Sequence, residues 1–366
     1  MSKNIEVYIV PVKRLIQLTL LAACVGVVSP CIAADFEPLS QPSPINSKWN
    51  SLVQLDVTRA GTRLVCVGER GFVGLSDDNG TSWRQAKVPV STTLTHVDFV
   101  DPKVGWAVGH SGVVLKTVDG GENWEKQFDG FSAANTELAS SKAIENVSET
   151  SQKRVKEAQR LVADGPDKPF LSVRFFDVQR GLIVGAYGLA FETVDGGRTW
   201  QSLVDRMDSG RSRHLYAIDT TGERIFLAGE QGVVLASKDD GKTFASLPFP
   251  GKGTVFGLVS SNSTLIAYGL KGAAYRSSDQ GENWVSIDLP KSTITTGLRL
   301  SNDDMVLGNE AGQLFVSKDG GRTFKQLKIR NPDPVSSLTE AADGAIVRAG
   351  VRGVSRVEVD GEESKK

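Results

Sequence analysis

The fold is decided by the stretch Thr193-Val194-Asp195-Gly196-Gly197-Arg198-Thr199-Trp200, whose pattern is Ser/Thr-x-Asp-x-Gly-x-x-aromatic. A carboxylate in this position accepts hydrogen bonds from nearby backbone N–H groups, as short polar side chains do in turns. Glycine reaches a positive φ without steric cost, and the aromatic side chain opens the next strand with a large apolar area to bury. The stretch therefore predicts a hairpin turn between two strands.

This aspartate turn occurs six times along the chain, centred on Asp78, Asp119, Asp195, Asp239, Asp279 and Asp319. The spacing is nearly constant, since 41 residues separate Asp78 from Asp119 and 40 separate Asp239 from Asp279. Each turn offers one carboxylate, without the dense set of oxygen ligands that a calcium site needs. We therefore interpret all six as structural turns.

A second repeat, Gly-x-x-Gly after a β-rich run, alternates with the first. Its copies begin at Gly68, Gly109, Gly185, Gly229, Gly269 and Gly350, and Gly308 begins a turn that reads one residue longer. Two glycines at this spacing suit a tight hairpin, and a strand follows rather than the helix of a phosphate-binding loop. Segments of period two, such as Tyr216/Ile218 and Phe256/Leu258, precede these glycine turns and indicate strands.

Each unit therefore reads strand, strand, glycine turn, strand, aspartate turn, strand, which is a propeller blade. We predict an all-β fold over residues 35–366, a seven-bladed β-propeller of four-stranded antiparallel blades. The seventh unit supplies only three strands. Residues 35–39 resemble the outer strands at 243–247 and 323–327, so we expect them to add the missing strand and close the ring. Residues 48–52 are a rival for that strand.

One spacing is irregular, because Asp119 and Asp195 lie 76 residues apart. Residues 135–163 contain no Gly or Pro, which favours helix. Ile144, Val147, Val155, Ala158 and Val162 fall on one helical stripe. We predict a helix or helical hairpin at about residues 130–168, between blades two and three, that projects from one face or folds over it.

The N-terminus has the pattern of a signal peptide covering residues 1–34, with Lys13 and Arg14 before an apolar run and Ala33 and Ala34 after it. An alternative is a lipoprotein anchored through Cys24, which follows Leu21-Ala22-Ala23. Both predict export, and we expect the periplasm. No second apolar run is long enough to span a bilayer, so direct membrane insertion is not expected after signal removal. The net charge of −1 argues against nucleic-acid binding.

In a propeller the glycine turns and the loops between blades share one face, and the aspartate turns lie on the other. We predict that the first face binds a partner through Arg70, His110, Arg174, Tyr187, Arg213, Glu230, Lys271, Arg299 and Arg352. Asp56, Asp98, Arg174 and Arg299 on the innermost strands would be costly to bury unpaired, so they either line a wet channel or pair with each other. Solvated turns without a docking role are the alternative.

No His/Cys spacing fits zinc, and no cofactor or metal is predicted. A glycoside hydrolase would need two carboxylates about 5–9 Å apart facing an open pocket, for which Asp56 and Asp98 are the candidates. A carbohydrate- or peptide-binding module would need exposed aromatic residues at the channel mouth, where the sequence indicates only Tyr187.

The aspartate turns resemble those of the sialidase/BNR-repeat superfamily, but no Arg-Ile-Pro motif occurs. The mature chain resembles the photosystem II stability/assembly factor family more closely, through Gly105-Trp106-Ala107-Val108-Gly109, Gly181-Leu182-Ile183-Val184-Gly185 and Thr117-Val118-Asp119-Gly120-Gly121. This resemblance implies an exported, non-catalytic seven-bladed propeller that assists the assembly of membrane complexes through an Arg-bearing face. Arg70, Arg174, Arg299 and Arg352 are candidates for that face.

The predicted helical insertion departs from the plant and cyanobacterial pattern of the family. The expected partner is therefore either a photosystem or another membrane protein complex, such as an envelope transporter component.

Overall fold

The computed structural model describes residues 37–144, 148–209, 212–261 and 264–359. The expected signal peptide and Cys24 lie outside these residues. Among the helices of the described residues, none is long and apolar enough to cross a membrane.

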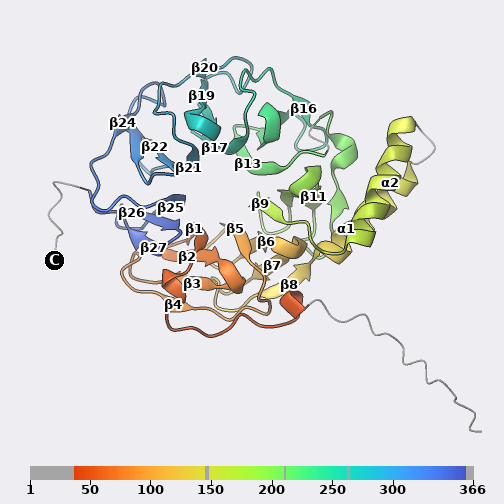
Figure 1. The fold of residues 1–366 in the computed structure, drawn as a ribbon, viewed down its shortest axis with the longest axis horizontal. Coiled ribbons are helices and arrows are strands. Elements are labelled where there is room, and N and C mark those ends of the chain that lie inside the picture. Colours follow the sequence, from red (N-terminus) through yellow and green to blue (C-terminus); the bar gives the residue numbers. More distant parts are fainter. Residues whose placement is uncertain (1–36, 145–147, 210–211, 262–263, 360–366) are drawn as a thin grey trace, which may run out of the picture. The chain divides into compact units, whose positions relative to one another are not determined.

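Seven antiparallel sheets are arranged around a common centre (Figure 1), which confirms the predicted propeller. Blade one contains β1 (Gln54–Ala60), β2 (Arg63–Gly68), β3 (Val73–Ser76) and β4 (Arg84–Gln85). Blade two contains β5 (Leu94–Phe99), β6 (Gly105–Gly109), β7 (Val114–Thr117) and β8 (Glu125–Phe128). Blade three contains β9 (Phe170–Phe175), β10 (Gly181–Gly185), β11 (Ala190–Thr193) and β12 (Gln201–Ser202).

Blades four to six repeat this order. Blade four contains β13 (Leu215–Thr221), β14 (Arg224–Gly229), β15 (Val234–Ser237) and β16 (Ala245–Ser246). Blade five contains β17 (Val255–Ser260), β18 (Leu265–Gly269), β19 (Ala274–Ser277) and β20 (Val285–Ser286). Blade six contains β21 (Ile294–Arg299), β22 (Met305–Asn309), β23 (Leu314–Ser317) and β24 (Lys325–Gln326). Within the described residues blade seven has three strands, β25 (Val335–Glu340), β26 (Ile346–Gly350) and β27 (Gly353–Arg356).

The first strand of every blade lies next to the first strand of the following blade, and β25 contacts β1, so the ring is closed. The apolar core lies between the blades. Trp106 of β6, for example, is fully buried and stacks on Phe175 of β9, with 3.4 Å between the ring centroids. Trp200, which ends the aspartate turn of blade three, is also buried in this core, with its ring centroid 6.0 Å from that of Phe128 in blade two, so the aromatic residue of the turn adds apolar area between neighbouring blades.

The ring does not close in the predicted way. Glu37–Leu39 form a short 3-10 helix, the carbonyl of Pro38 accepts a hydrogen bond from Ser91 N, and Leu39 is buried in the core that blades one and two share. The strand predicted at residues 35–39 is therefore wrong for its described part. The rival segment reaches blade seven, but Trp49–Ser51 form a 3-10 turn rather than a strand.

Trp49 is buried between blades one and seven, against Val347 and Ala349, so packing rather than strand pairing holds this segment. Hydrogen bonds complete the junction. Ser336 Oγ donates to Gln54 O at 2.8 Å, and Ser337 Oγ donates to Asp56 Oδ1 at 2.5 Å.

The insertion between blades two and three is a helical hairpin, as predicted, made of α1 (Gly130–Ala143) and α2 (Glu149–Asp164). Asp129 caps α1 by accepting from Ser132 N, and Ser148 and Ser151 form a capping box at the start of α2. The hairpin lies at the rim of the ring, where α1 packs against β12 and contacts the glycine turn of blade two (Figure 1). It does not fold over a face, which was one of the two expected positions. β12 is an outer strand, so α1 covers an edge that would otherwise be unpaired.

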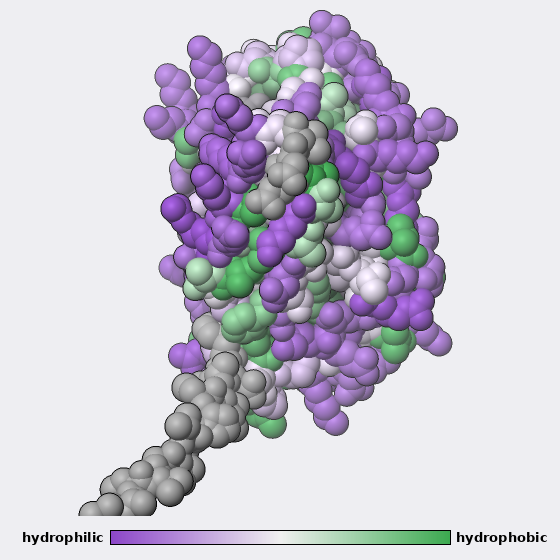
Figure 2. Space-filling view, turned by 90° about the vertical axis from the view of Figure 1, so that its right-hand side faces the viewer, coloured by the Kyte–Doolittle hydropathy of each residue, from purple (hydrophilic) through white to green (hydrophobic). Residues whose placement is uncertain are grey.

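Part of the predicted helical stripe is also wrong. Val155 and Ala158 are buried, whereas Val162 is exposed and Leu161 packs against the core instead. Val147 lies outside the described residues. Figure 2, which faces this rim, shows a largely hydrophilic surface with apolar patches near its middle.

Candidate functional site

The glycine turns, which join the second and third strands of the blades, lie on one face of the ring, here called the glycine-turn face. In blade two a Cβ on Gly109 would lie 2.1 Å from Thr93 O, which accepts a hydrogen bond from His110 N, so the first glycine allows this close approach. Ser111 and Gly112 follow with φ of 58° and 63°, which is the backbone of a type I′ hairpin turn. The same left-handed conformation at the third position points the side chains of Arg70, Tyr187, Gln231 and Lys271 outward from the turn tips.

Blade six departs from the repeat in a way that the sequence did not indicate. Its turn is not one residue longer, because Asn309 replaces the first glycine. The Asn309 side chain is buried, and its Oδ1 accepts from the backbone N–H groups of Ala311 and Gln313.

Five of the predicted partner-binding residues lie exposed on the glycine-turn face: Arg70, His110, Tyr187, Lys271 and Arg352. Arg352 Nη1 reaches Asp333 Oδ1 at 3.1 Å, so its charge is partly compensated. Glu230 is half-buried, and its carboxylate accepts from His214 N at 2.9 Å. This face therefore carries a mixed but mainly basic set of side chains.

Arg174 and Arg299 lie elsewhere. Each lies near the C-terminal end of the innermost strand of its blade, next to the turn that joins the first two strands. This turn is at the same end of the blade as the aspartate turn. Arg174 Nη1 lies 3.2 Å from Asp98 Oδ1, and Arg299 Nε lies 2.6 Å from Asp303 Oδ1. The four arginines that the sequence grouped as one surface are thus divided between the two ends of the channel.

Asp56 and Asp98 tie neighbouring blades together. Asp56 Oδ2 accepts from Val97 N at 2.8 Å, and its Oδ1 accepts from Ser337 Oγ. Asp98 Oδ2 accepts from Phe175 N at 2.8 Å. Both carboxylates are largely buried, so their hydrogen bonds join blade seven to one, one to two and two to three.

The aspartate turns lie on the opposite face. In each, the Ser or Thr hydroxyl two residues before the Asp donates to its Oδ1, and the carboxylates concerned are those of Asp78, Asp119, Asp195, Asp239, Asp279 and Asp319. Among the described residues no group of three or more His, Cys, Asp or Glu side chains is placed to hold a metal ion.

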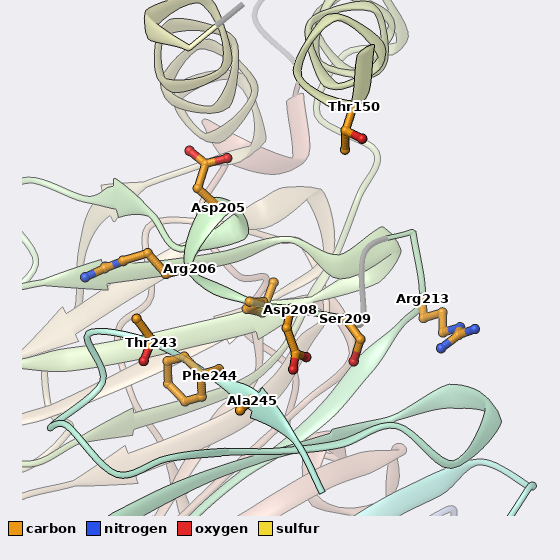
Figure 3. Close-up of a pocket in the computed structure, with 10 residues that line it drawn as sticks. Thr150, Asp205, Arg206, Asp208, Ser209, Arg213, Thr243, Phe244 and Ala245 are labelled. Carbon is orange, nitrogen blue, oxygen red and sulfur yellow. The ribbon is translucent and has the colours of Figure 1, made fainter. Parts of the chain in front are cut away.

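Arg213 does not lie at the channel mouth. It lines a cavity of about 740 Å³ at the rim, between the start of α2, the linker that precedes β13, and the start of β16 (Figure 3). The acidic groups of this cavity are already engaged, because Asp205 pairs with Arg154 and Asp208 accepts from Ser246. These contacts fix the helical hairpin and the linker to the ring.

Sequence reasoning missed a row of aromatic side chains that crosses blades three, four and five. The ring centroids of Tyr187 and His214 are 4.9 Å apart, those of His214 and Tyr216 are 6.2 Å apart, and those of Tyr216 and Phe256 are 5.3 Å apart. His214 Nδ1 also accepts from Tyr187 N at 3.0 Å. We call Tyr187, His214, Tyr216 and Phe256 the aromatic row.

The signal for this row was present in the alternation of the strands. Leu215 and Ala217 are buried between blades while Tyr216 is only half-buried, and Phe256 has the same relation to Val255 and Gly257. The period-two pattern indicated strands, but it did not indicate which alternate set faces the channel. Burial, followed by the nearby charge of Glu230, raises the pKa of the Tyr216 phenol.

A second cavity, of about 340 Å³, lies in blade five. It lies between the loop that precedes β17 and the glycine turn of the same blade, and Phe249, Lys252, Leu270, Lys271 and Tyr275 are among its lining residues.

Residues 75–147 and 151–299, more than half of the chain, match the family described as photosynthesis system II assembly factor YCF48. The chain belongs to this family. The resemblance indicated by the sequence motifs is thereby confirmed.

Among curated YCF48-type relatives, a chloroplastic photosystem II stability/assembly factor HCF136 from Cyanidioschyzon merolae is 26% identical over 195 residues, which are 47% of this chain and 42% of the relative. A photosystem II assembly lipoprotein Ycf48 from a Synechococcus strain is 31% identical over 77 residues, 21% of this chain and 23% of the relative. The matches thus span less than half the length of these relatives.

Solved structures show the same fold. A structure titled YCF48 bound to D1 peptide has a TM-score of 0.60 and 14% identity, covering 88% of this chain and 98% of that chain. YCF48 from Cyanidioschyzon merolae has a TM-score of 0.60 and 13% identity, with coverage of 87% and 98%. The WD40 propeller domain of Doa1 is as similar, with a TM-score of 0.61 and 13% identity over 89% and 98%, so this likeness concerns the fold alone.

Proposed function

We propose that this protein is an exported, non-catalytic assembly factor whose glycine-turn face binds a segment of a membrane protein complex. The observation that carries the proposal is the aromatic row, which begins at the exposed turn residue Tyr187 and has Lys168 Nζ 5.3 Å from the centroid of that ring. Flat aromatic side chains flanked by basic groups suit the backbone and side chains of an extended segment. Family relatives are named as photosystem II assembly factors, and one solved relative is titled as bound to a D1 peptide, which supports a membrane-protein client.

The periplasm is the proposed location, with the signal peptide at residues 1–34 removed. A lipid anchor at Cys24 is the alternative, and the relative named as a lipoprotein supports it. The proposed client is either a photosystem or another envelope complex. The second alternative is based on the helical hairpin, which adds a further surface at the rim of the ring.

The test is affinity purification of the tagged full chain from detergent-solubilised envelope. One variant carries Arg70→Gln, Tyr187→Ser and Arg352→Gln. Gln231 and Ser111 already occupy the left-handed turn position of Arg70 and Tyr187 in other blades, so these changes keep the turns intact. The control carries Lys318→Gln and Lys325→Gln, two exposed lysines of blade six.

We expect one membrane complex to be recovered with the wild type and the control, and recovery to fall at least tenfold with the face variant. Equal recovery with all three proteins would show that the glycine-turn face is not the docking surface.

A further inference from the structure

The blade-five cavity arises from a local change in the loop that precedes β17. In the loop between blades one and two, the carbonyl of Val90 lies against the glycine turn at Gly71, and the Val90 side chain is fully buried. The carbonyl of Gly251 lies in the same way against Gly232 of blade four, but Gly251 has no side chain, and Phe249 occupies the place where one would begin, 2.5 Å from an added Cβ. Gly253 also has no side chain, and an added Cβ there meets no atom closer than 3.7 Å, so the space beside Gly253 is open.

The walls of the cavity are apolar and are held in place. Phe249 packs edge-on against Tyr275 and Trp284, with 5.0 and 5.1 Å between the ring centroids. Gly253 O accepts a hydrogen bond from Gly232 N at 2.8 Å, which ties the loop to the blade-four turn. Leu270 keeps 38% of its surface exposed at the rim. A cavity of about 340 Å³ with these walls is large enough for one apolar or aromatic side chain.

The rim of this cavity is basic. Lys252 and Lys271 line it and are exposed, and Lys291 lies in the next loop against Gly272. Within the part of the chain that the structure describes, none of these three ammonium groups has a carboxylate partner. The nearby Glu230 and Glu310 are engaged with the backbone N–H groups of His214 and Thr293. The local field therefore favours carboxylates on whatever enters the cavity.

We propose that the blade-five cavity is an anchor site for an extended acidic segment, which inserts one apolar or aromatic side chain while its flanking carboxylates face Lys252 and Lys271. This inference rests on the proposed docking function and names the class of segment that the glycine-turn face selects. The aromatic row ends at Phe256 of blade five, and the adjacent Val255 lines this cavity, so the segment lies across the row and is fixed at the blade-five end. Segments without the anchor or without the carboxylates bind weakly.

The test uses three fluorescein-labelled decapeptides and protein purified after expression of the full chain. One peptide has a single Phe flanked by Asp and Glu, the second has Ala in place of the Phe, and the third has Asn and Gln in place of the acids. Fluorescence anisotropy measures binding. We expect the acidic Phe peptide to bind at least tenfold more tightly than the other two.

Two variants separate the two parts of the site. Lys252→Ser with Lys271→Gln introduces the residues that stand at equivalent positions elsewhere in the ring. These are Ser91 in the loop between blades one and two and Gln231 in the glycine turn of blade four. This double variant is expected to abolish the preference for acidic peptides. Gly253→Leu fills the cavity, since the nearest atom to an added Cβ is Leu270 Cβ at 3.7 Å, and is expected to abolish the preference for Phe. Lys325→Gln on blade six is the matched control, and melting temperatures check that each variant is folded.

Equal binding of the three peptides, or variants that bind like the wild type, would overturn the anchor site. If that happens while the Arg70, Tyr187 and Arg352 variant still loses the membrane complex, the docking function stands and only the anchor site fails. If capture of the complex is also unaffected, the docking function fails as well. Binding of phosphatidylglycerol vesicles that is lost in the double lysine variant, without peptide binding, would assign the lysines to a lipid surface and would likewise overturn the proposal.

Discussion

At the scale of single residues, the aspartate turns explain why the repeat uses a carboxylate. Asp279 Oδ1 accepts from Ser277 Oγ and Asn283 N, and its Oδ2 accepts from Asn283 Nδ2 at 2.8 Å. The hydrogen bond from the Asn283 side chain, followed by that from its backbone, lowers the Asp279 pKa from the ordinary value of 3.8 to about 2. An amide in this position would lose one acceptor.

These lowered pKa values predict a dependence of stability on pH. Asp78, Asp195 and Asp239 share a folded-state pKa of about 2, so their contribution is complete above about pH 4 and is lost as the pH falls toward 2. The melting temperature should fall over that interval. Asp279→Asn should lower the melting temperature at pH 7 by about 2 °C and make the acid dependence shallower, while Asp288→Asn in an exposed loop should do neither. Thermal melts from pH 2 to 7 measure this, and an unchanged melting temperature down to pH 2 would contradict it.

The first glycine of each glycine turn is required for steric reasons. Gly109→Ala places a methyl group against Thr93 O and should lower the free energy of unfolding by about 1–3 kcal/mol, as overpacking does. Gly253→Ala meets no atom closer than 3.7 Å, so it is the matched control and should be nearly neutral. Denaturant unfolding compares the two. Equal stability of both variants would mean that the loop carbonyl moves away without loss.

At the scale of elements, the helical hairpin is held by one buried cation. Arg154 of α2 is 4% exposed, its Nε lies 2.6 Å from Glu137 Oε1 of α1, and its Nη2 donates to Ser202 Oγ of β12 at 3.2 Å. The guanidinium also pairs with Asp205 of the following linker. A single side chain thus joins both helices to the outer edge of blade three.

Removing this cation should leave the buried Glu137 carboxylate without its counter-charge, while the Ser202 hydroxyl still donates to it. Arg154→Met is expected to lower the free energy of unfolding by about 3–5 kcal/mol, and Arg154→Met with Glu137→Met should recover much of that loss, because burial of an unpaired carboxylate is the main penalty. Lys153→Met on the exposed side of α2 serves as the control. Urea denaturation measures these three variants and Glu137→Met alone. A double variant as unstable as the sum of its single variants would exclude this explanation.

The same scale shows what the sequence could and could not predict. Strands, turns and the presence of the helices follow from local patterns, because a turn such as Ser277–Trp284 is satisfied by its own residues. Other features depend on surfaces that are distant in the sequence. These are the cores in which Leu39 and Trp49 are buried, the position of the hairpin at the rim, and the packing of Leu161 instead of Val162 against the core. The candidate site was predicted only in part, because some of its features are local and others depend on contacts between distant segments. The exposed turn tips follow from the repeat, whereas the aromatic row arises only where neighbouring blades meet, and the blade-five cavity arises where the loop before β17 meets the glycine turn of the same blade.

At the scale of the whole molecule, the described residues join blade seven to blade one without a strand that both ends of the chain share. In blades two and six the second residue of the innermost strand bonds to the following blade, because Thr95 Oγ1 donates to Phe170 O at 2.7 Å and Thr295 Oγ1 donates to Val335 O at 2.6 Å. Ser336 makes the equivalent bond from blade seven to Gln54 O of blade one, and Ser337 adds a bond to Asp56. With three strands in blade seven among the described residues, the closure depends on these bonds, on Arg356 Nη1, which donates to Asn79 O at 2.7 Å, and on the apolar core around Trp49.

Ser336→Ala with Ser337→Ala should therefore weaken this junction selectively. Each lost hydrogen bond is expected to cost about 1 kcal/mol, and the Asp56 oxygen that loses Ser337 still accepts from Val57 N, which limits the damage. Amide hydrogen exchange should become faster in β25 and β26 than in the strands of blade four, because local opening begins where the fewest contacts must break. Thr95→Ala, which removes the equivalent bond between blades two and three, should leave the exchange of blade seven unchanged. If both variants accelerate exchange evenly around the ring, the propeller opens as one cooperative unit and its closing junction is no weaker than the others.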